Sequence, residues 1–326
     1  WNPHARKMQE IPKLGLGTWK IGKDCVANVV YDAIKNLNMR HFDCACDYGN
    51  EVEVGHGIKR AIDEGIVKRE DLWITSKLWN TYHRAEHVEM ACRKSLTDLG
   101  LDYLDLYLIH FPISMKFVPF EVRYPPEWIH DPSGPDPRIE VDPHAPVHLT
   151  WAAMEQLVGA GLTKHIGVAN FNVQLLTDVL SYAVIPPYAN QVELHPYLVQ
   201  QELVDFCQSK KVEVTAFSPL GSGSYIELGG DKGMGRGVLE HETVLAVAAA
   251  HNKSPAQCVL RWNVQREVGI IPKASTASHL AENAAIFDFT LTEEEMAQIA
   301  ALNCNARFND PGVFCKFMGG AIPIFN

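Results

Sequence analysis

Four polar side chains in the first part of the chain follow short apolar runs and have the types needed for proton chemistry. Asp43, Lys77 and His110 each stand at the end of such a run, and Tyr48 follows Asp43 in the next connection. Each residue alone has an ordinary structural explanation, as a capping aspartate, a surface tyrosine, a solvated lysine or a core histidine. If the runs are parallel strands of one barrel, however, their carboxyl ends meet at one mouth and bring the four side chains together.

These residue types suit the reduction of a carbonyl group, which needs a hydride donor on one side and a proton donor at the oxygen. A tyrosine is a weak acid with a reference pKa of about 10, and a lysine ammonium within about 4–6 Å stabilises its phenolate. Asp43 would keep Lys77 charged and in place. His110 would donate a hydrogen bond that orients the carbonyl oxygen. The pattern therefore predicts Tyr48 as the general acid of a reductase.

The apolar runs that position these residues alternate with amphipathic stretches along the whole chain. Most are continuously apolar, which is typical of parallel strands covered on both faces. Eight strand–helix units predict a closed (β/α)₈ TIM barrel or a large doubly wound sheet, and residue content does not choose between them. We expect a single domain over 1–326, because barrels of this size commonly form one. The expected strands are 13–17, 40–43, 72–75, 104–109, 164–168, 189–192, 212–217 and 268–272.

Three of the expected helices have recognisable start signals. In 24–38 the apolar residues fall on one face, and Asp24 is expected as the N-cap. Ser254 followed by Pro255 predicts a capped helix with proline at its first position. Thr292, with a glutamate three residues on, predicts a capping box.

Two connections are longer than a barrel requires, after the fourth and the seventh strand. The first, 111–147, is rich in proline, and the second, 221–237, is rich in glycine. Because both follow the carboxyl ends of strands, we expect them to border the active site. The glycine-rich connection is the better candidate for a lid.

Composition limits the kinds of partner. The net charge of −10 disfavours nucleic acid and anionic membrane surfaces. No apolar run approaches the roughly 18 residues needed to cross a bilayer. The eight cysteines are scattered, which favours unpaired thiols and a cytoplasmic location. Cys44 and Cys46 lack a second pair at zinc spacing, so we expect no metal. We expect a small-molecule carbonyl partner and a monomer or weak homodimer.

Several longer runs carry a resemblance to a known family. They are LGLGTW at 14–19, FD at 42–43, DYGNE at 47–51, SKLW at 76–79, LDYLDLYLIHFP at 101–112, IGVANF at 166–171, NQVE at 190–193, HPY at 195–197, IPK at 271–273 and RFNDP at 307–311. On these runs the chain resembles the aldo-keto reductases over nearly its whole length, and the aldose and xylose reductases most. The resemblance implies a (β/α)₈ barrel with NADPH extended across its mouth. It also implies Tyr48 as general acid, Lys77 and Asp43 adjusting its acidity, and His110 orienting the substrate.

The cofactor site is not of the Rossmann type, because Gly15 and Gly17 are followed by Lys20 where the fingerprint needs a third glycine. The resemblance implies a different set of contacts. Asn170, Gln191 and Phe217 would hold the nicotinamide, Ser218, Leu220 and Ser222 would line the pyrophosphate, and Lys273, Ser275, Thr276, His279, Glu282 and Asn283 would surround the 2′-phosphate and adenine. Thr18, Trp19 and Asp43 are also expected to contact the cofactor.

Three of these positions depart from the family's usual residues. Ala169 replaces a serine and loses a hydroxyl near the carboxamide, while Phe217 replaces a tyrosine and keeps the stacking face. His279 replaces an arginine, and a neutral imidazole is a weaker phosphate partner than a guanidinium fork. Because Lys273 and two hydroxyls remain, we expect NADPH, with NADH use possible.

By resemblance, the substrate pocket is lined by Trp19, Asp47, Trp79, His110, Phe111 and Asn309. In similar xylose reductases, the positions of Asp47 and Asn309 face sugar hydroxyls, and a buried polar pair disfavours apolar substrates that leave it unsatisfied. The expected substrate is therefore an open-chain sugar or sugar-derived aldehyde. Two alternatives remain: a reductase of bulky carbonyls such as a ketosteroid or lipid aldehyde, and a non-catalytic barrel that binds NADPH.

Overall fold

A computed structural model describes residues 10–221, 237–320 and 322–325 of the chain. Its centre is one sheet of eight parallel strands, whose order in the sheet is their order along the chain. All eight expected strands are present, within a few residues of the expected bounds. They are β1 Leu16–Gly17, β2 His41–Asp43, β3 Trp73–Leu78, β4 Leu104–Ile109, β5 Thr163–Ala169, β6 Ala189–Glu193, β7 Glu213–Phe217 and β8 Gly269–Ile270.

The sheet closes on itself through the segment that precedes β1. Leu14 forms a parallel bridge with Ile270 of β8. The Ile270 amide donates to the Lys13 carbonyl at 2.7 Å, and the Gly15 amide donates to the Ile270 carbonyl at 2.8 Å. At Gly17 the approach is so close that a Cβ would lie 2.6 Å from the Ile271 carbonyl oxygen, so only glycine fits there. The strands therefore form a closed barrel, which decides against an open doubly wound sheet.

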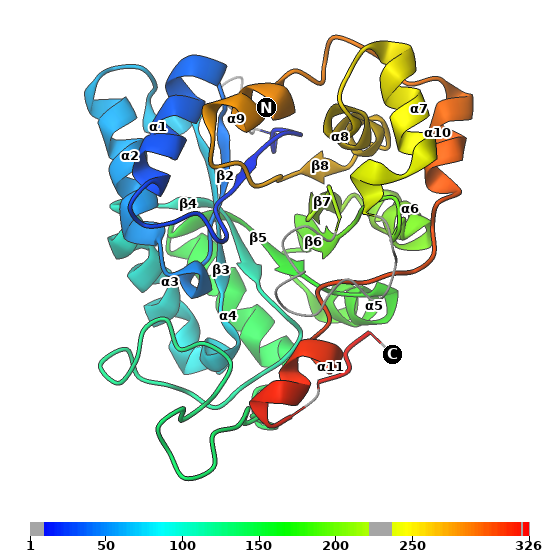
Figure 1. Ribbon diagram of the computed structural model, residues 1–326. Coiled ribbons are helices and arrows are strands. Elements are labelled where there is room, and N and C mark those ends of the chain that lie inside the picture. The colour runs from blue at the N-terminus through cyan, green and yellow to red at the C-terminus, as the bar shows by residue number, and fades with distance from the viewer. Residues whose placement is uncertain (1–9, 222–236, 321, 326) are drawn as a thin grey trace, which may run out of the picture.

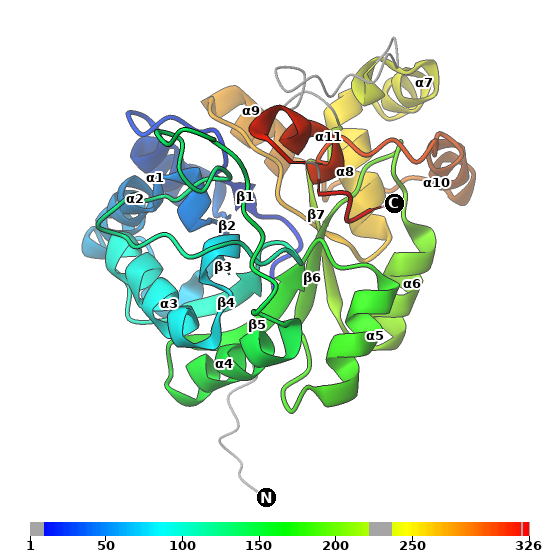
Figure 2. The same ribbon diagram turned by 90° about the horizontal axis from the view of Figure 1, so that it is seen from below.

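The helices form an outer layer around the strands (Figure 1), and the view from below shows α1 to α6 arranged around them (Figure 2). Their apolar faces pack on the barrel, as the parallel runs covered on both sides predict. The helices are α1 Val26–Leu37, α2 Glu51–Asp63, α3 Ala85–Leu99, α4 Val147–Gly159, α5 Val173–Tyr182, α6 Gln201–Ser209, α7 Glu242–His251, α8 Pro255–Gln265, α9 Ala277–Ala284, α10 Glu293–Ala300 and α11 Pro311–Phe314.

Two of the three expected helix starts are confirmed. The Ser254 hydroxyl caps α8, with Pro255 in the first turn, and Thr292 forms the capping box of α10. The prediction of Asp24 as the cap of α1 is wrong. That helix begins one residue later, with Cys25 as N-cap and no side-chain cap bond, because the Gly22 carbonyl receives the amide of Val26 at 2.9 Å.

The connection after β4 is an ordered structure at the carboxyl end of the barrel. Met115 and Val141 form an antiparallel bridge within it, and Arg84 anchors the buried carboxylate of Asp142 at 2.6 Å. This connection and α11 lie at the same end of the molecule, the lower end in Figure 1. Most of the expected lid, 222–236, lies outside the described residues. Within the part of the chain that is described, no helix has the length and apolarity needed to span a membrane.

Candidate active site

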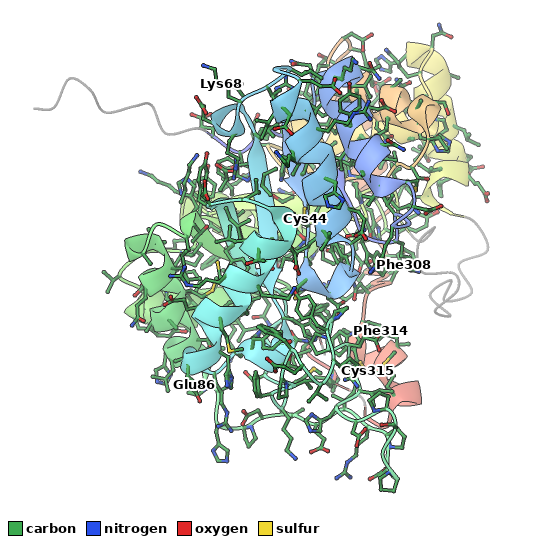
Figure 3. The ribbon with its side chains drawn as sticks, turned by 90° about the vertical axis from the view of Figure 1, so that its left-hand side faces the viewer. Cys44, Lys68, Glu86, Phe308, Phe314 and Cys315 are labelled. Atoms are coloured by element: carbon green, nitrogen blue, oxygen red, sulfur yellow. The ribbon has the colours of Figure 1, made fainter. Side chains whose placement is uncertain are left out.

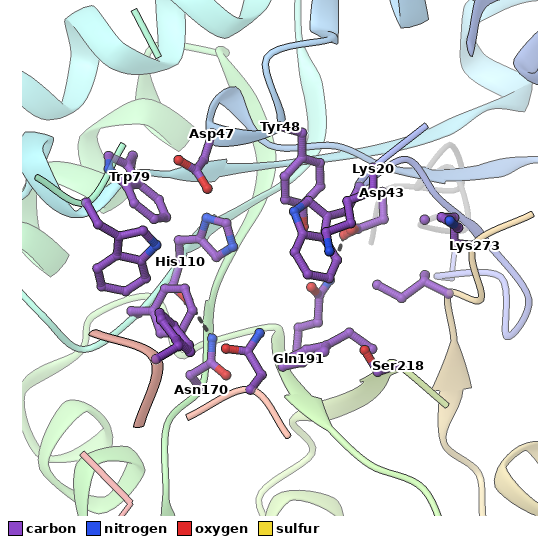
Figure 4. A pocket seen from close by; sticks show the side chains of 18 of the residues that line it. Lys20, Asp43, Asp47, Tyr48, Trp79, His110, Asn170, Gln191, Ser218 and Lys273 are labelled. Atoms are coloured by element: carbon purple, nitrogen blue, oxygen red, sulfur yellow. Dashed lines mark hydrogen bonds between the residues drawn. The ribbon is translucent and has the colours of Figure 1, made fainter. Parts of the chain in front are cut away.

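Asp43, Tyr48 and Lys77 meet at the carboxyl ends of β2 and β3. Figure 4 shows Asp43 and Tyr48 among the residues that line the pocket. The Lys77 ammonium donates to Asp43 Oδ2 at 2.7 Å, to the Cys44 carbonyl at 2.9 Å and to the Tyr48 hydroxyl at 3.0 Å. Its side chain is fully buried, and three acceptors use its three N–H groups. The charge is thus compensated where an unpaired ammonium would be costly.

Asp43 is held from the neighbouring strands as well. Gln191, on β6, donates from Nε2 to Asp43 Oδ1 at 2.6 Å. Thr18, which follows β1, donates from its hydroxyl to the Asp43 carbonyl at 2.9 Å. With Lys77 on the other carboxylate oxygen, both oxygens of Asp43 are engaged, so the carboxylate is fixed across the barrel mouth.

His110 follows β4 and faces Tyr48 from the other side of the pocket, with the ring centroids 6.0 Å apart. Burial, together with the positive charge of Lys77, places the pKa of His110 well below its usual range. Its imidazole is therefore neutral at physiological pH. Nδ1 is buried, and among the described residues it has no hydrogen-bond partner. A neutral ring held in this way can donate one hydrogen bond to a substrate oxygen.

These residues border a pocket of about 290 Å³. Many of the residues expected to contact cofactor or substrate line it. They are Trp19, Asp43, Asp47, Tyr48, Trp79, His110, Phe111, Asn170, Gln191, Phe217, Ser218, Lys273 and Asn309. Trp79 lies toward one end of the pocket and Lys273 toward the other (Figure 4). Lys77 is not among the residues that line this pocket, but its hydrogen bond to Tyr48 connects it to one that does.

Aromatic rings from three segments form one wall of the pocket. Trp79 packs edge-on against His110, Phe111 and Trp128, with centroids 5.2, 6.2 and 5.1 Å away. The Trp79 indole donates to the carbonyl of Glu127 in the β4 connection at 3.1 Å. The connection after β4 therefore borders the pocket, as its position in the sequence predicts.

Asp47 and Asn309 are two polar residues that line the same pocket. Asp47 lies in a 3₁₀ turn, Cys46–Tyr48, directly before the candidate acid. Burial, and then the nearby charge of Glu127, raises the pKa of Asp47 to about 7. Asn309 approaches from the carboxyl-terminal segment and lines the same pocket. The pocket therefore combines an apolar wall with a few placed hydrogen-bonding groups, which is the usual make-up of a small-molecule site.

The residues expected around the 2′-phosphate gather at the start of α9. Thr276 is the N-cap of this helix and accepts from the His279 amide at 3.3 Å. Lys273, Ser275, Thr276 and His279 are all exposed. A helix amino terminus with a lysine and hydroxyls beside it suits an anion.

The remaining expected cofactor residues differ in accessibility. Glu282 is half-buried and Asn283 is buried. Leu220 is half-buried and packs on the core, and Thr18 is fully buried and contacts Asp43 rather than the pocket. Ser222 lies outside the described residues.

Sequence reasoning missed several lining residues, namely Gly17, Lys20, Trp128, Ile271, Phe314 and Met318. Lys20 could have been found, because it is a charged residue beside a strand end, and its ammonium lies 4.8 Å from the Trp19 ring. Trp128 lies in the irregular connection after β4, whereas Phe314 and Met318 lie in two short helical turns near the carboxyl terminus, and no local pattern shows that these segments reach the pocket. Among the described residues, no cluster of side chains could hold a metal ion.

The nicotinamide end of a dinucleotide fits the residues present. Asn170 donates from Nδ2 to the His110 carbonyl at 2.8 Å, whereas its Oδ1 is buried and has no partner among the described residues. A carboxamide NH₂ in the pocket would satisfy this oxygen. Phe217 lines the same pocket and has an aromatic ring on which a nicotinamide could stack.

Comparisons with known proteins agree with this geometry. The model of the aldo/keto reductase family matches residues 13–304. A probable NAD(P)H-dependent D-xylose reductase of Aspergillus clavatus is 49% identical over 95% of this chain and 92% of its own length. The NAD(P)H-dependent D-xylose reductase of Scheffersomyces stipitis is 48% identical over 97% and 96%, and that of Pyricularia oryzae is 46% identical over 93% and 92%. The chain belongs to the aldo/keto reductase family.

Proposed function

We propose that this protein reduces the aldehyde of an open-chain sugar to the alcohol, with NADPH as the reductant. The observation that carries the proposal is that Asp47 and Asn309, two polar side chains, line the same pocket as Tyr48 and His110. The names of the relatives, all D-xylose reductases, support the same substrate class.

The chemistry follows from the hydrogen-bond chain behind Tyr48. NADPH, when bound, supplies the hydride to the carbonyl carbon. Tyr48 donates its hydroxyl proton to the carbonyl oxygen, and Lys77, 3.0 Å away, stabilises the phenolate that remains. Asp43 balances the lysine charge, and His110 donates a hydrogen bond to the same oxygen.

The cofactor would lie along the residues that link the pocket to α9. Asn170, Gln191 and Phe217 would hold the nicotinamide, and Lys273 with the amino terminus of α9 would hold the 2′-phosphate. NADPH is favoured because Lys273 gives a fixed positive charge there. NADH use is also expected, because the imidazole of His279 is a weaker hydrogen-bond partner for the phosphate than an arginine guanidinium would be.

The polar lining of the pocket favours a hydroxylated substrate over a bulky apolar one. Asp47 and Asn309 both line the pocket, whose volume is about 290 Å³. A sugar chain offers hydroxyl groups to both side chains, whereas a steroid offers them apolar surface.

The experiment is NADPH oxidation across aldoses, uronates, aromatic aldehydes and ketosteroids, with the wild type and with Asn309→Ala. We expect the highest kcat/KM on an aldose among hydroxylated substrates, and a selective loss on aldoses in the variant of about 2- to 12-fold. Equal losses of kcat/KM on aldose and benzaldehyde would mean that Asn309 does not read hydroxyls.

A further inference from the structure

Glu193 ends β6, and its fully buried carboxylate binds two consecutive main-chain amides of the carboxyl-terminal segment. The Phe308 amide donates to Oε1 at 2.7 Å, and the Asn309 amide donates to Oε2 at 2.7 Å. Each oxygen thus fixes one residue. Because 193 and 308–309 are far apart in the sequence, this contact fixes how the terminal segment crosses the barrel mouth.

The environment keeps Glu193 ionised. Burial by itself would raise the pKa of its carboxyl group, but the interactions with His195, at 2.9 Å, with the charge of Arg307 and with the Phe308 amide together outweigh burial and hold the pKa below its ordinary value. The ring of His195 also stacks on Phe308, with centroids 5.1 Å apart. A charged acceptor makes both amide bonds stronger than neutral ones.

A second tie runs through the main chain of the same residue. Gln200 donates from Nε2 to the Glu193 carbonyl at 2.6 Å and accepts from Arg307 at 3.2 Å. The Ala306 amide donates to the Tyr197 carbonyl at 3.0 Å. Residues 306–309 are therefore attached to the end of β6 and the turn that follows it.

This attachment determines where two pocket residues lie. Asn309, whose own amide is bound, lines the pocket. Directly after it, Asp310 caps α11, and Phe314 at the end of that helix packs edge-on against Trp128, with centroids 5.4 Å apart. Figure 3 shows Phe308 and Phe314 on this segment, beside the connection that follows β4.

From these contacts we infer that Glu193 is a positioning residue for substrate specificity, which acts by fixing Asn309 at the pocket. The side-chain hydrogen bonds of Glu193 go to His195 and to the amides of Phe308 and Asn309, and among the described residues none goes to Asp43, Tyr48 or Lys77. Its loss should therefore affect recognition of the substrate far more than the chemical step. The inference rests on the proposed role of Asn309 in reading sugar hydroxyls.

The test variant is Glu193→Gln, which keeps the shape but offers one acceptor oxygen and turns an NH₂ group toward an amide N–H. We expect KM for D-xylose to rise on the order of tenfold, the effect of a lost hydrogen bond with a stranded amide. We expect kcat, kcat/KM for benzaldehyde and Kd for NADPH to stay within about twofold. The matched control is Glu213→Gln, at the opposite end of the next strand, where the carboxylate pairs with half-exposed Lys13.

Two further readouts separate positioning from a general loss of structure. In a double-mutant cycle, Glu193→Gln should have little further effect on KM for D-xylose once Asn309→Ala is present, because the first acts through the second. Deuterium uptake of a peptide covering 303–314 should increase in Glu193→Gln and not in Glu213→Gln. If Glu193→Gln does not fold, Gln200→Asn shortens the second tie with a residue that tolerates the positive φ there, and it should raise KM for D-xylose in the same direction.

The inference is overturned if Glu193→Gln, or Gln200→Asn in its place, lowers kcat on both substrates equally. It is also overturned if the effects of Glu193→Gln and Asn309→Ala on KM are additive, or if deuterium uptake of 303–314 is unchanged. A failure of the proposed function looks different. Asn309→Ala alone would then lower kcat/KM for D-xylose and for benzaldehyde equally, while the deuterium uptake of 303–314 in Glu193→Gln would still rise.

Discussion

The Lys77 ammonium lies 3.0 Å from the Tyr48 hydroxyl and 2.7 Å from the Asp43 carboxylate, with no part of its side chain exposed. This relationship gives the tyrosine a partner whose charge cannot be screened by solvent. It would favour a phenolate at Tyr48 after the proposed proton transfer, and it holds the phenol in place beside the pocket.

The first prediction concerns Asp47 and pH. Because burial raises its pKa to about 7, the carboxyl group is mostly neutral at pH 6 and mostly charged at pH 8. Charge-assisted bonds to hydroxyls are roughly twice as strong as neutral ones. The ratio of kcat/KM for D-xylose to kcat/KM for benzaldehyde should therefore increase from pH 6 to 8. Taking the ratio on one enzyme cancels the titration of groups that act on both substrates.

The matched control for Asp47 is Asp47→Asn, which cannot ionise. Its ratio of kcat/KM values should be flat across the same pH range. A ratio that rises equally in wild type and Asp47→Asn would assign the pH effect to another group.

The second prediction concerns the choice of cofactor at α9. His279→Arg places a guanidinium fork beside Lys273 and the amino terminus of the helix, where a 2′-phosphate is expected. NADPH should bind tighter by roughly 1–2 kcal/mol, or about 5- to 30-fold in Kd, because charge-assisted pairing with phosphate is strong. NADH lacks that phosphate, so its Kd should change little. Equal shifts for the two cofactors, measured by fluorescence titration, would mean that position 279 is not at the phosphate.

The third prediction concerns stability. Glu51 is buried beside the Ser76 and Ser95 hydroxyls, which donate to it at 2.6 and 2.9 Å. Burial raises the pKa of Glu51 from 4.5 to about 7 in the folded protein. Between these values the folded state holds a proton that the unfolded state releases, so the contribution of Glu51 to stability falls as pH rises through this range.

Glu51→Gln removes this titration and keeps the shape of the side chain. The difference in Tm between Glu51→Gln and the wild type should increase by a few degrees from pH 5 to pH 8. Over this range the titration of Glu51 removes about 2–3 kcal/mol of stability from the wild type only. Glu89→Gln, on the exposed face of α3, is the control and should give a difference that is flat with pH. A flat difference for Glu51→Gln as well would show that Glu51 titrates normally.

Much of the fold and the centre of the site could be predicted from the sequence. Continuous apolar runs mark the eight buried strands because parallel strands are covered on both faces, and the polar residues that end them meet at the mouth. Residue content alone does not predict barrel closure, because closure depends on Leu14 pairing with Ile270 far along the chain, whereas the resemblance to the family does predict a barrel. The contact between Glu193 and Phe308 and the contact between the rings of Trp128 and Trp79 also join residues that are far apart in the sequence. Such contacts leave no periodic signal in the sequence.

One prediction from a local sequence pattern, the N-cap of α1, is wrong. Asp24 has the type and position of a helix cap, but a main-chain carbonyl, that of Gly22, takes the role. The choice between side chain and main chain depends on the turn that leads into the helix, and the residue types alone do not determine that turn.

The central claim, that Tyr48 gives the proton to the substrate, is tested most directly by Tyr48→Phe. The measurement is kcat for D-xylose reduction under saturating NADPH, together with Kd for NADPH in the same preparation. We predict a fall in kcat on the order of 10²–10⁴-fold, the usual contribution of a general acid, with Kd for NADPH unchanged. A variant that turns over at nearly the wild-type rate with unchanged NADPH binding would contradict the account.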